Sequence, residues 1–434
     1  MIQKKEKLAF FGGKPILKKP FPQAESLGSE EERAVARVMK SRVLSGFVGR
    51  AGEKFLGGPE VRRFEKLVEK ALKVKYAVSY NSATTALQGA IAALGIGPGD
   101  EVITTPYTMA ATAMSILLNG AVPVFADIED DTFCLDPVSV EERITKRTKA
   151  ILVVNLFGGS ARLLELKRVA KKSKLYLIED NAQSIGAKLG KKFLGTIGDV
   201  GILSFNANKI LQSGEGGVVI TDSKKIAFRA QLSRNHGEVV IDDVRDSVSF
   251  EAIVGSNYRM TELHAAIAYE QMRKLSRLIR PRVLLGQYLT KQLKRFSWII
   301  PVYIPKSSTH TYYVYPFRFL KKKIGFSRET LIKALTAEGF PLGAGYVKPL
   351  YLLPIFQKRR MYPNSTFPFV FEGRKAPVYK KGICPVAERM FKEELLFITI
   401  CNHERSKRDI DLFVRAIKKI TNNITVLKHY ERSH

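Results

Sequence analysis

Short apolar runs alternate with helical segments along the middle of the chain, from residue 76 to residue 222. Turn residues or amphipathic stretches separate each run from the next. Strands that alternate with helices in this way are typical of a mainly parallel sheet with helices on both faces, whose ligands bind beyond the carboxyl ends of the strands. The predicted strands are the runs 77–80, 101–104, 122–125, 150–155, 175–179, 200–205 and 218–220.

The two ends of the chain have different patterns. A helix is predicted to begin at Ser29, because three glutamates follow it and acidic residues favour the first turn of a helix. Towards the C-terminus, a strand-like run (312–319), a helical run (328–338) and a loop rich in proline and aromatic residues (347–371) indicate an α+β unit. The prediction is an α/β fold: a large domain with a mainly parallel seven-stranded sheet flanked by helices over residues 59–275, a smaller C-terminal α+β domain over 276–434, and an N-terminal segment, 1–58, that packs on both.

The composition is that of an ordinary soluble globular protein, apart from its charge. Of the 434 residues, 45% are hydrophobic and 26% are charged, and the formal net charge is +30. The basic residues are spread along the whole chain and form no nucleic-acid-binding motif with aromatic residues, so we interpret them as a solvated surface and do not expect nucleic acid as a partner. The same positive field would attract phosphorylated or nucleotide-linked substrates.

No stretch of the sequence is typical of a secretory signal or of a membrane span. The N-terminal apolar run, 8–11, is far shorter than the core of a signal peptide, and the apolar stretch 114–126 is interrupted by glycine and proline. Cys134, Cys384 and Cys401 are scattered and are not spaced as metal ligands, which fits a reducing compartment. We therefore expect a cytoplasmic protein without a membrane partner and without a bound metal.

A single lysine, Lys209, lies in the polar turn between the predicted strands 200–205 and 218–220. Apolar neighbours disfavour the charged form of a lysine and lower its pKa towards the range in which the amine is a nucleophile, as a Schiff base requires. Most lysines are solvated surface charges, and perturbed ionisable groups can be purely structural. The hypothesis that Lys209 is catalytic therefore depends on its neighbours.

Two other polar features follow predicted strands of the same sheet. Asp180 follows the strand 175–179, where a carboxylate faces the ligand crevice and could pair with a protonated ring nitrogen, or could only cap the next segment. The segment 81–85, Asn-Ser-Ala-Thr-Thr, opens an alanine-rich helix; such a helix start can bind an anion, and plain capping explains it equally well when it is considered alone. Together with Lys209, these features match an aldehyde cofactor that has a phosphate and a pyridine nitrogen.

In combination, the motifs resemble those of the DegT/StrS-type sugar aminotransferases, which are pyridoxal-phosphate enzymes with the aspartate-aminotransferase-like fold, fold type I. The resemblance covers nearly the whole chain. It is carried by NSATTAL (81–87), GPGDEVITTPYTMAAT (97–112), DPVSVEERITKRTKAI (136–151), IEDNAQSIGA (178–187), SFNANKILQSGEGG (204–217) and NYRMTELHAAIA (257–268).

The resemblance implies a role for each matching residue. Lys209 would bind pyridoxal 5'-phosphate as a Schiff base and would then transfer the proton at the reacting carbon. Asp180 would keep the ring nitrogen protonated, and Gln183 would hydrogen-bond the ring hydroxyl oxygen. The phosphate would be bound by Ser82, Ala83, Thr84 and Ser204. The family pattern also implies a homodimer with shared active sites, in which Asn257 reaches the phosphate of the neighbouring subunit.

The sequence departs from the family pattern at two positions. Many members have an aromatic residue that stacks on the cofactor ring, whereas this chain has Met109, which would lie against the ring unless Tyr107 substitutes. A thioether can also pack on an aromatic face. Asn155 stands where a histidine is common. Neither change removes a group that the chemistry needs, but both bear on the class of substrate.

The resemblance implies amino transfer from glutamate or glutamine to a keto sugar or to a keto-cyclitol. For the keto sugar, we favour a nucleotide-linked one. A related alternative is dehydration of a deoxysugar, which Lys209 disfavours because a histidine replaces this lysine in the dehydratases. Another alternative is a regulator that binds nucleic acid on its basic surface and has a vestigial cofactor site. Candidate substrate contacts in the C-terminal part are His310, Tyr346 and Lys348.

Overall fold

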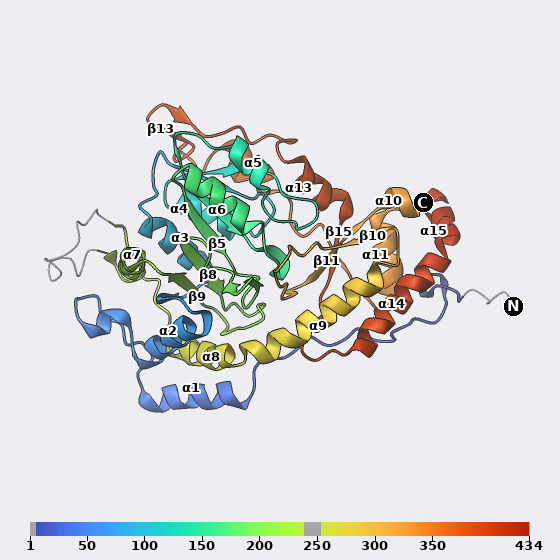
Figure 1. The fold of residues 1–434 in the computed structure, drawn as a ribbon, viewed down its shortest axis with the longest axis horizontal. Coiled ribbons are helices and arrows are strands. Elements are labelled where there is room, and N and C mark those ends of the chain that lie inside the picture. Colours follow the sequence, from blue (N-terminus) through green and yellow to red (C-terminus); the bar gives the residue numbers. More distant parts are fainter. Residues whose placement is uncertain (1–5, 238–252, 434) are drawn as a thin grey trace.

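A seven-stranded sheet forms the centre of the larger part of the structure, a computed structural model that describes residues 6–237 and 253–433 (Figure 1). The strand order is β1-β9-β8-β5-β4-β2-β3. Only β9 runs antiparallel to its neighbours within this sheet, so the prediction of a mainly parallel seven-stranded sheet is confirmed. The bounds are β1 (Tyr76–Tyr80), β2 (Glu101–Thr104), β3 (Val122–Phe125), β4 (Thr148–Val154), β5 (Tyr176–Asp180), β8 (Val200–Ser204) and β9 (Gly217–Thr221).

Alternating side chains of the strands build two hydrophobic cores, one on each face of the sheet. Val78 and Val219 belong to the core that includes α3 (Ala83–Ala93). Their sequence neighbours Ala77 and Val218 belong to the opposite core, as the two-residue period of a strand requires. The helices that line the two faces are α2 (Pro59–Leu72), α4 (Ala111–Leu118), α6 (Leu163–Lys172), α7 (Lys224–Arg234) and α8 (Glu262–Arg273).

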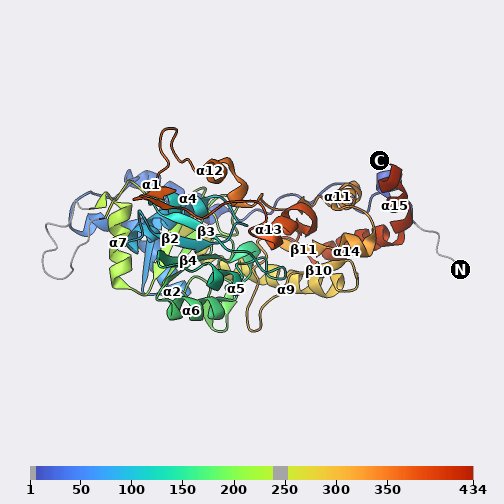
Figure 2. The same cartoon turned by 90° about the horizontal axis from the view of Figure 1, so that it is seen from above.

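A smaller antiparallel sheet forms the second part of the structure, with the order β10-β11-β15-β12. The long helix α9 (Leu275–Leu293) runs from the region of α8 towards this sheet (Figures 1 and 2). The predicted strand at 312–319 begins later, at Tyr315, and the predicted helix at 328–338 is α11. The bounds are β10 (Ile299–Pro301), β11 (Tyr315–Phe319), β12 (Gly343–Ala344), β15 (Leu395–Ile398), α11 (Arg328–Ala337) and α14 (Lys407–Asn422).

Shorter elements connect these parts. They are the helices α5 (Pro137–Glu142), α10 (Lys321–Ile324), α12 (Pro354–Lys358), α13 (Pro385–Arg389) and α15 (Ile424–Ser433), a π-helical turn at Met390–Glu394, 3-10 turns at Ala9–Phe11, Glu53–Leu56, Leu156–Gly158 and Leu350–Leu352, and the hairpins β6 (Lys188–Leu189) with β7 (Lys192–Phe193) and β13 (Val370–Phe371) with β14 (Arg374–Lys375).

The N-terminal segment contacts both parts of the structure. Its helix α1 (Ser29–Ser41) begins at Ser29 as predicted and packs on α8. Before α1, the backbone N–H groups of Ala9 and Ile16 donate to the carboxylate of Glu338, next to the C-terminal end of α11, at 2.8 and 3.1 Å. On this basis we propose domain boundaries near residues 58 and 275, with residues 1–5 outside the described part of the segment.

Among residues 6–237 and 253–433, no helix combines the length and the apolar character that crossing a membrane requires.

Candidate active site

Lys209 lies in the turn that connects β8 to β9, just beyond the carboxyl end of β8. Hydrogen bonds across the turn fix its path, including Ser213 N to Phe205 O at 2.7 Å and Ala207 N to Gly214 O at 2.8 Å. Gly214 has a φ of +78°, a conformation that glycine adopts without steric cost. The glycine-rich end of this turn therefore allows the chain to reverse and return as the antiparallel strand β9.

Burial lowers the pKa of Lys209 below its ordinary value, and the nearby carboxylate of Asp180 opposes this shift. The Nζ atom lies 4.9 Å from the centroid of the Tyr313 ring. An aromatic face attracts a cation but supplies no proton acceptor of the strength of a carboxylate. The neutral amine, which is the nucleophilic form, is thus more accessible than on an exposed lysine.

Asp180 is the last residue of β5, the strand next to β8 in the sheet. The carboxylate is buried; its Oδ2 accepts from Thr112 Oγ1 at 3.1 Å and its Oδ1 accepts from Ala182 N at 3.0 Å. Burial raises the pKa of Asp180, while these two hydrogen bonds and Lys209 act in the opposite direction. The structure therefore brings together the acid and the amine that the sequence placed after neighbouring strands.

The turn at Ser82 meets the start of β9 at a glycine, Gly217. Ser82 caps α3, and its Oγ accepts from Thr85 N at 3.1 Å. A Cβ atom on Gly217 would lie 2.3 Å from Ser82 O and 2.5 Å from Ala83 N, so only glycine permits this close approach. Gly217 is also paired with Ser204 in the sheet.

This arrangement places Ser204 beside the start of α3, where Ala83 and Thr84 form the first turn. The first backbone N–H groups of a helix have no partner within the helix, and they carry the positive end of the helix dipole. A phosphate is the kind of group that such a turn binds. The residues predicted to bind phosphate within one chain are therefore neighbours in space.

Gln183 is buried, and both ends of its amide are engaged. Its Oε1 accepts from Phe157 N at 2.9 Å and its Nε2 donates to the Tyr346 hydroxyl at 2.7 Å. Burial raises the pKa of Tyr346 to about 12, so this hydroxyl is protonated at neutral pH. Tyr346, which the sequence suggested as a substrate contact, positions Gln183 in this structure.

Two of the predicted site residues are exposed. The side chain of Asn257 accepts from Arg259 Nε at 2.9 Å, and the following residue, Tyr258, accepts from Asn81 N through its carbonyl at 2.8 Å. Met109 is 57% exposed, and its sulfur accepts from the backbone of Ala111 at 3.0 Å. Both residues are therefore accessible to a group from outside the chain.

Tyr107 cannot take the place of Met109 as a stacking residue. It is fully buried, and its hydroxyl donates to Gly345 O at 2.7 Å. Asn155, the other departure from the family pattern, is also buried and donates to Asn181 Oδ1 at 2.7 Å. It supports the loop after β5 and does not face an open site.

His310 does not have the position of a substrate contact, which corrects the prediction from the sequence. It is buried, its Nδ1 accepts from Tyr312 N at 3.0 Å, and burial lowers its pKa to about 3. Lys348 is exposed and, like His310, does not line the cavity that contains Lys209. Burial therefore keeps the imidazole of His310 neutral, and its role in this structure is structural.

A cavity of about 580 Å³ contains Lys209, and residues from three separate regions line it. Its volume is in the range of small-molecule sites. Of the described residues that line it, basic ones predominate, and Glu25 is the one acid. The lining includes the turn around Lys209, the residues Arg282, Tyr313, His403 and Arg405 of the C-terminal part, and the N-terminal stretch 20–26, which we call the strap.

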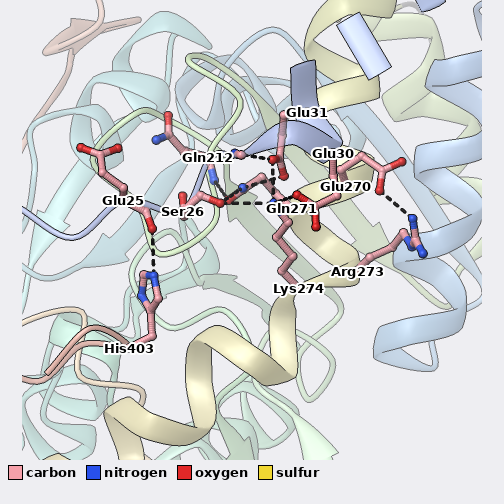
Figure 3. Close-up of polar contacts among 11 residues, drawn as sticks. Glu25, Ser26, Glu30, Glu31, Gln212, Glu270, Gln271, Arg273, Lys274 and His403 are labelled. Atoms are coloured by element: carbon pink, nitrogen blue, oxygen red, sulfur yellow. Dashed lines mark hydrogen bonds and ion pairs between the residues drawn. The ribbon is translucent and has the colours of Figure 1, made fainter. Parts of the chain in front are cut away.

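Hydrogen bonds from both parts of the structure fix the strap (Figure 3). His403 Nε2 donates to Glu25 O at 2.9 Å, and Gln271 Nε2 donates to Ser26 O at 2.9 Å. Lys274 Nζ and Glu31 form a buried ion pair at 2.6 Å beside Gln271. The strap is therefore held in a fixed position and forms one side of the cavity.

Sequence reasoning missed Arg282, Tyr313 and the strap. Each lies far from Lys209 along the chain and outside the segments that follow the strands of the large sheet. No local motif marks them. Only the packing of the C-terminal part and of the N-terminal segment against the large sheet brings them to the cavity of Lys209.

Comparison with known proteins gives three consistent findings. Residues 48–371 match the DegT/DnrJ/EryC1/StrS aminotransferase family. A putative L-glutamine:3-amino-2,3-dideoxy-scyllo-inosose aminotransferase of Micromonospora echinospora is 31% identical over 98% of this chain and 99% of its own length. The GDP-perosamine synthase of Caulobacter vibrioides is 35% identical over 68% of this chain and 78% of its own length.

The fold has a close match among solved structures. The X-ray structure of the aminotransferase from Psychrobacter cryohalolentis superposes with a TM-score of 0.79 and 26% identity, covering 94% of this chain and all of that one (100%).

Proposed function

The chain belongs to the DegT/DnrJ/EryC1/StrS aminotransferase family, and from this premise we propose that it uses pyridoxal phosphate to transfer an amino group from glutamine or glutamate to the ketone of a cyclitol or a sugar. The observation that carries the proposal is the juxtaposition of Lys209, a buried amine with a lowered pKa, and the buried carboxylate of Asp180. A dehydratase of the same family would need a different residue in place of this amine.

The residues of the site fit the cofactor. When bound, pyridoxal phosphate withdraws electrons from the carbon that loses or gains a proton. Asp180 would keep a proton on the ring nitrogen, and Lys209 Nζ would bind the aldehyde carbon and carry the proton of the reacting carbon. Gln183 would orient the ring hydroxyl, and the phosphate would be bound by Ser82, Ala83, Thr84 and Ser204, whose backbones meet at the close approach of Gly217.

The relatives favour a polyhydroxylated ketone as the acceptor. The cyclitol enzyme aligns over 98% of this chain, which includes the C-terminal part that lines the cavity, whereas the nucleotide-sugar enzyme aligns over 68%. We therefore propose a keto-cyclitol as the first acceptor to test and a nucleotide-linked keto sugar as the second.

The proposed reaction is tested by following the amino group. The protein is incubated with pyridoxal phosphate, isotopically labelled glutamine or glutamate, and either ketone, and the products are analysed by mass spectrometry. Transfer of labelled nitrogen to the ketone carbon is the expected result. Loss of water without gain of nitrogen would instead support the dehydration alternative.

We propose a homodimer in which Asn257 serves the site of the partner subunit. Asn257 is exposed, and it lies beside the Asn81 turn through the hydrogen bond from Asn81 N to Tyr258 O. The family pattern, in which the matching asparagine reaches the phosphate of the neighbouring subunit, supports this proposal, and the exposure of Asn257 makes it accessible to a second chain. Light scattering should give twice the mass of 48.7 kDa, and a monomer that is fully active would contradict the proposal.

The rate at which cofactor-free protein captures pyridoxal phosphate should rise with pH and level off below 10.5, the ordinary pKa of a lysine. Burial lowers the pKa of Lys209, so the neutral amine predominates at a lower pH than on an exposed lysine. Asp180 raises this pKa, so Asp180→Asn should shift the plateau to lower pH still. Stopped-flow absorbance across a pH series measures both profiles, and a shift to higher pH in the variant would contradict this assignment.

Asp180→Asn should also reduce turnover by about 10²–10³-fold, in line with the loss of one preorganised electrostatic group. The amide has nearly the same shape, but it carries no charge to keep a ring nitrogen protonated. Steady-state kinetics with saturating cofactor provide the measurement. Thr112→Val, which removes the hydroxyl that donates to Asp180 at 3.1 Å, should have a smaller effect in the same direction.

A further inference from the structure

Arg282 is a cation without an anionic partner inside the cavity of Lys209. It follows Pro281 within α9, and it donates two hydrogen bonds through Nη1, to Tyr312 O at 3.1 Å and to Cys401 O at 3.3 Å. Its Nε is buried and has no hydrogen-bond partner among the described residues. No carboxylate of residues 6–237 and 253–433 lies within 4.0 Å of the guanidinium.

Arg282 is half-buried, and a cation that is partly removed from water is normally paired with a carboxylate. Other basic residues of this protein follow that rule: Lys274 is paired with Glu31 at 2.6 Å, and Lys419 with Glu338 at 2.8 Å. Burial also lowers the pKa of Arg282 to about 10, as expected for a cation beside which no carboxylate lies. Among the residues that the structure describes, the partners of Arg282 are carbonyl oxygens, and both accept from Nη1.

The free groups of Arg282 have the geometry of a carboxylate receptor. Nε and Nη2 lie on the same edge of the planar guanidinium, and this edge forms two parallel hydrogen bonds to one carboxylate. With Nη1 fixed by two carbonyls, the orientation of the plane is set before any ligand arrives. Preorganisation of this kind lowers the entropic cost of binding.

Tyr313 connects this receptor to the reactive amine. The Lys209 Nζ lies 4.9 Å from the centre of its ring, and the guanidinium of Arg282 opposes the rise that burial causes in the pKa of its hydroxyl. Arg282 and Lys209 both line the same cavity. A small molecule in this cavity can therefore contact both groups.

We propose that Arg282 binds the α-carboxylate of the amino donor, which is the charged group that glutamine and glutamate share next to the amine. This assignment rests on the proposed function, because it identifies the donor's anchor within that same site. A phosphate is a poorer candidate, since the turn at Ser82 already offers a site for the phosphate of the cofactor.

A binding measurement tests the assignment without turnover. Glutaramate is glutamine without its amino group, and glutaramide has an amide in place of its carboxylate, so the two ligands differ in charge and hardly in shape. Calorimetric titration of the wild-type protein should show that glutaramate binds about tenfold or more tightly than glutaramide, as expected for a charge-assisted bidentate pair. In Arg282→Gln this preference should disappear.

Two variants serve as controls. Arg280→Gln removes an exposed arginine from the same helix and should keep the full preference. Arg282→Lys keeps a positive charge but lacks the planar edge, so it should keep only part of the preference and fold even if Arg282→Gln does not. A wild-type protein that binds both ligands equally, or an Arg282→Gln protein that still prefers glutaramate, would overturn the assignment.

Kinetics separate this inference from the proposed function. Arg282→Gln should raise the KM for glutamine by about tenfold to a hundredfold and leave the KM for the ketone unchanged. A wild-type protein that transfers no nitrogen to any ketone would contradict the proposed function. Normal transfer with an unchanged donor KM in the variant would contradict the role of Arg282 alone.

Discussion

Replacing Lys209 by alanine is expected to reduce amino transfer by a factor of about 10⁴ or more, the largest loss that any single substitution in this protein should cause. The side chain provides both the nucleophilic amine and the proton carrier, and each role alone contributes about 10²–10⁴-fold. No other lysine lines the cavity among the described residues, so none is placed to substitute for it. Single-turnover and steady-state assays with glutamine and a keto-cyclitol measure the loss.

Lys191→Ala is the matched control for this substitution, because Lys191 is exposed in the short hairpin between β6 and β7. It should be as active as the wild type. Added methylamine should restore part of the activity of Lys209→Ala, since a free amine can enter the space that the side chain leaves. A variant that retains a tenth of the wild-type activity without added amine would contradict the assignment of Lys209.

The second large effect concerns stability: Glu65→Gln should lower the free energy of unfolding by about 3–5 kcal/mol, because it leaves a buried arginine without its counter-charge. Arg234 is fully buried, and its Nη1 lies 2.6 Å from Glu65 Oε1. The same carboxylate accepts from the backbone and from the hydroxyl of Ser79, both at 2.8 Å. Urea unfolding followed by circular dichroism measures the change.

Glu65 belongs to α2 and Ser79 to β1, the strand that leads into the Ser82 turn. The loss should therefore also weaken cofactor binding. Lys172→Gln breaks the exposed pair with Glu141 and should leave the unfolding midpoint unchanged. An equally small effect of Glu65→Gln would show that water reaches Arg234 in solution.

Much of the fold could be predicted, because the strands of a parallel sheet are buried on both faces and appear as continuous apolar runs. All seven strands of the large sheet were predicted from such runs. The direction of β9 could not be predicted in this way: it is as apolar as its neighbours, and only the short turn after β8 makes it antiparallel. The late start of β11 at Tyr315 reflects a buried loop, 309–314, that is as apolar and aromatic as a strand.

The site residues that could be predicted from the sequence are those at the ends of the strands of the large sheet. Asp180 is the last residue of its strand, and Ser82 and Lys209 lie in the turns that follow two other strands of the same sheet, so their proximity follows from the topology. Arg282 and Tyr313 come from a helix and a loop of the C-terminal part, and their place depends on how that part packs on the large sheet. His310 was predicted as a substrate contact from its residue type alone. The structure buries it, so it cannot contact a substrate in the cavity.

The most direct test of the central claim is reduction of the protein with borohydride in the presence of pyridoxal phosphate, followed by peptide mapping with mass spectrometry. One stable adduct is expected, on the peptide that contains Lys209, and none is expected in Lys209→Ala. An adduct on another lysine, or the absence of any adduct in the wild-type protein, would contradict the claim.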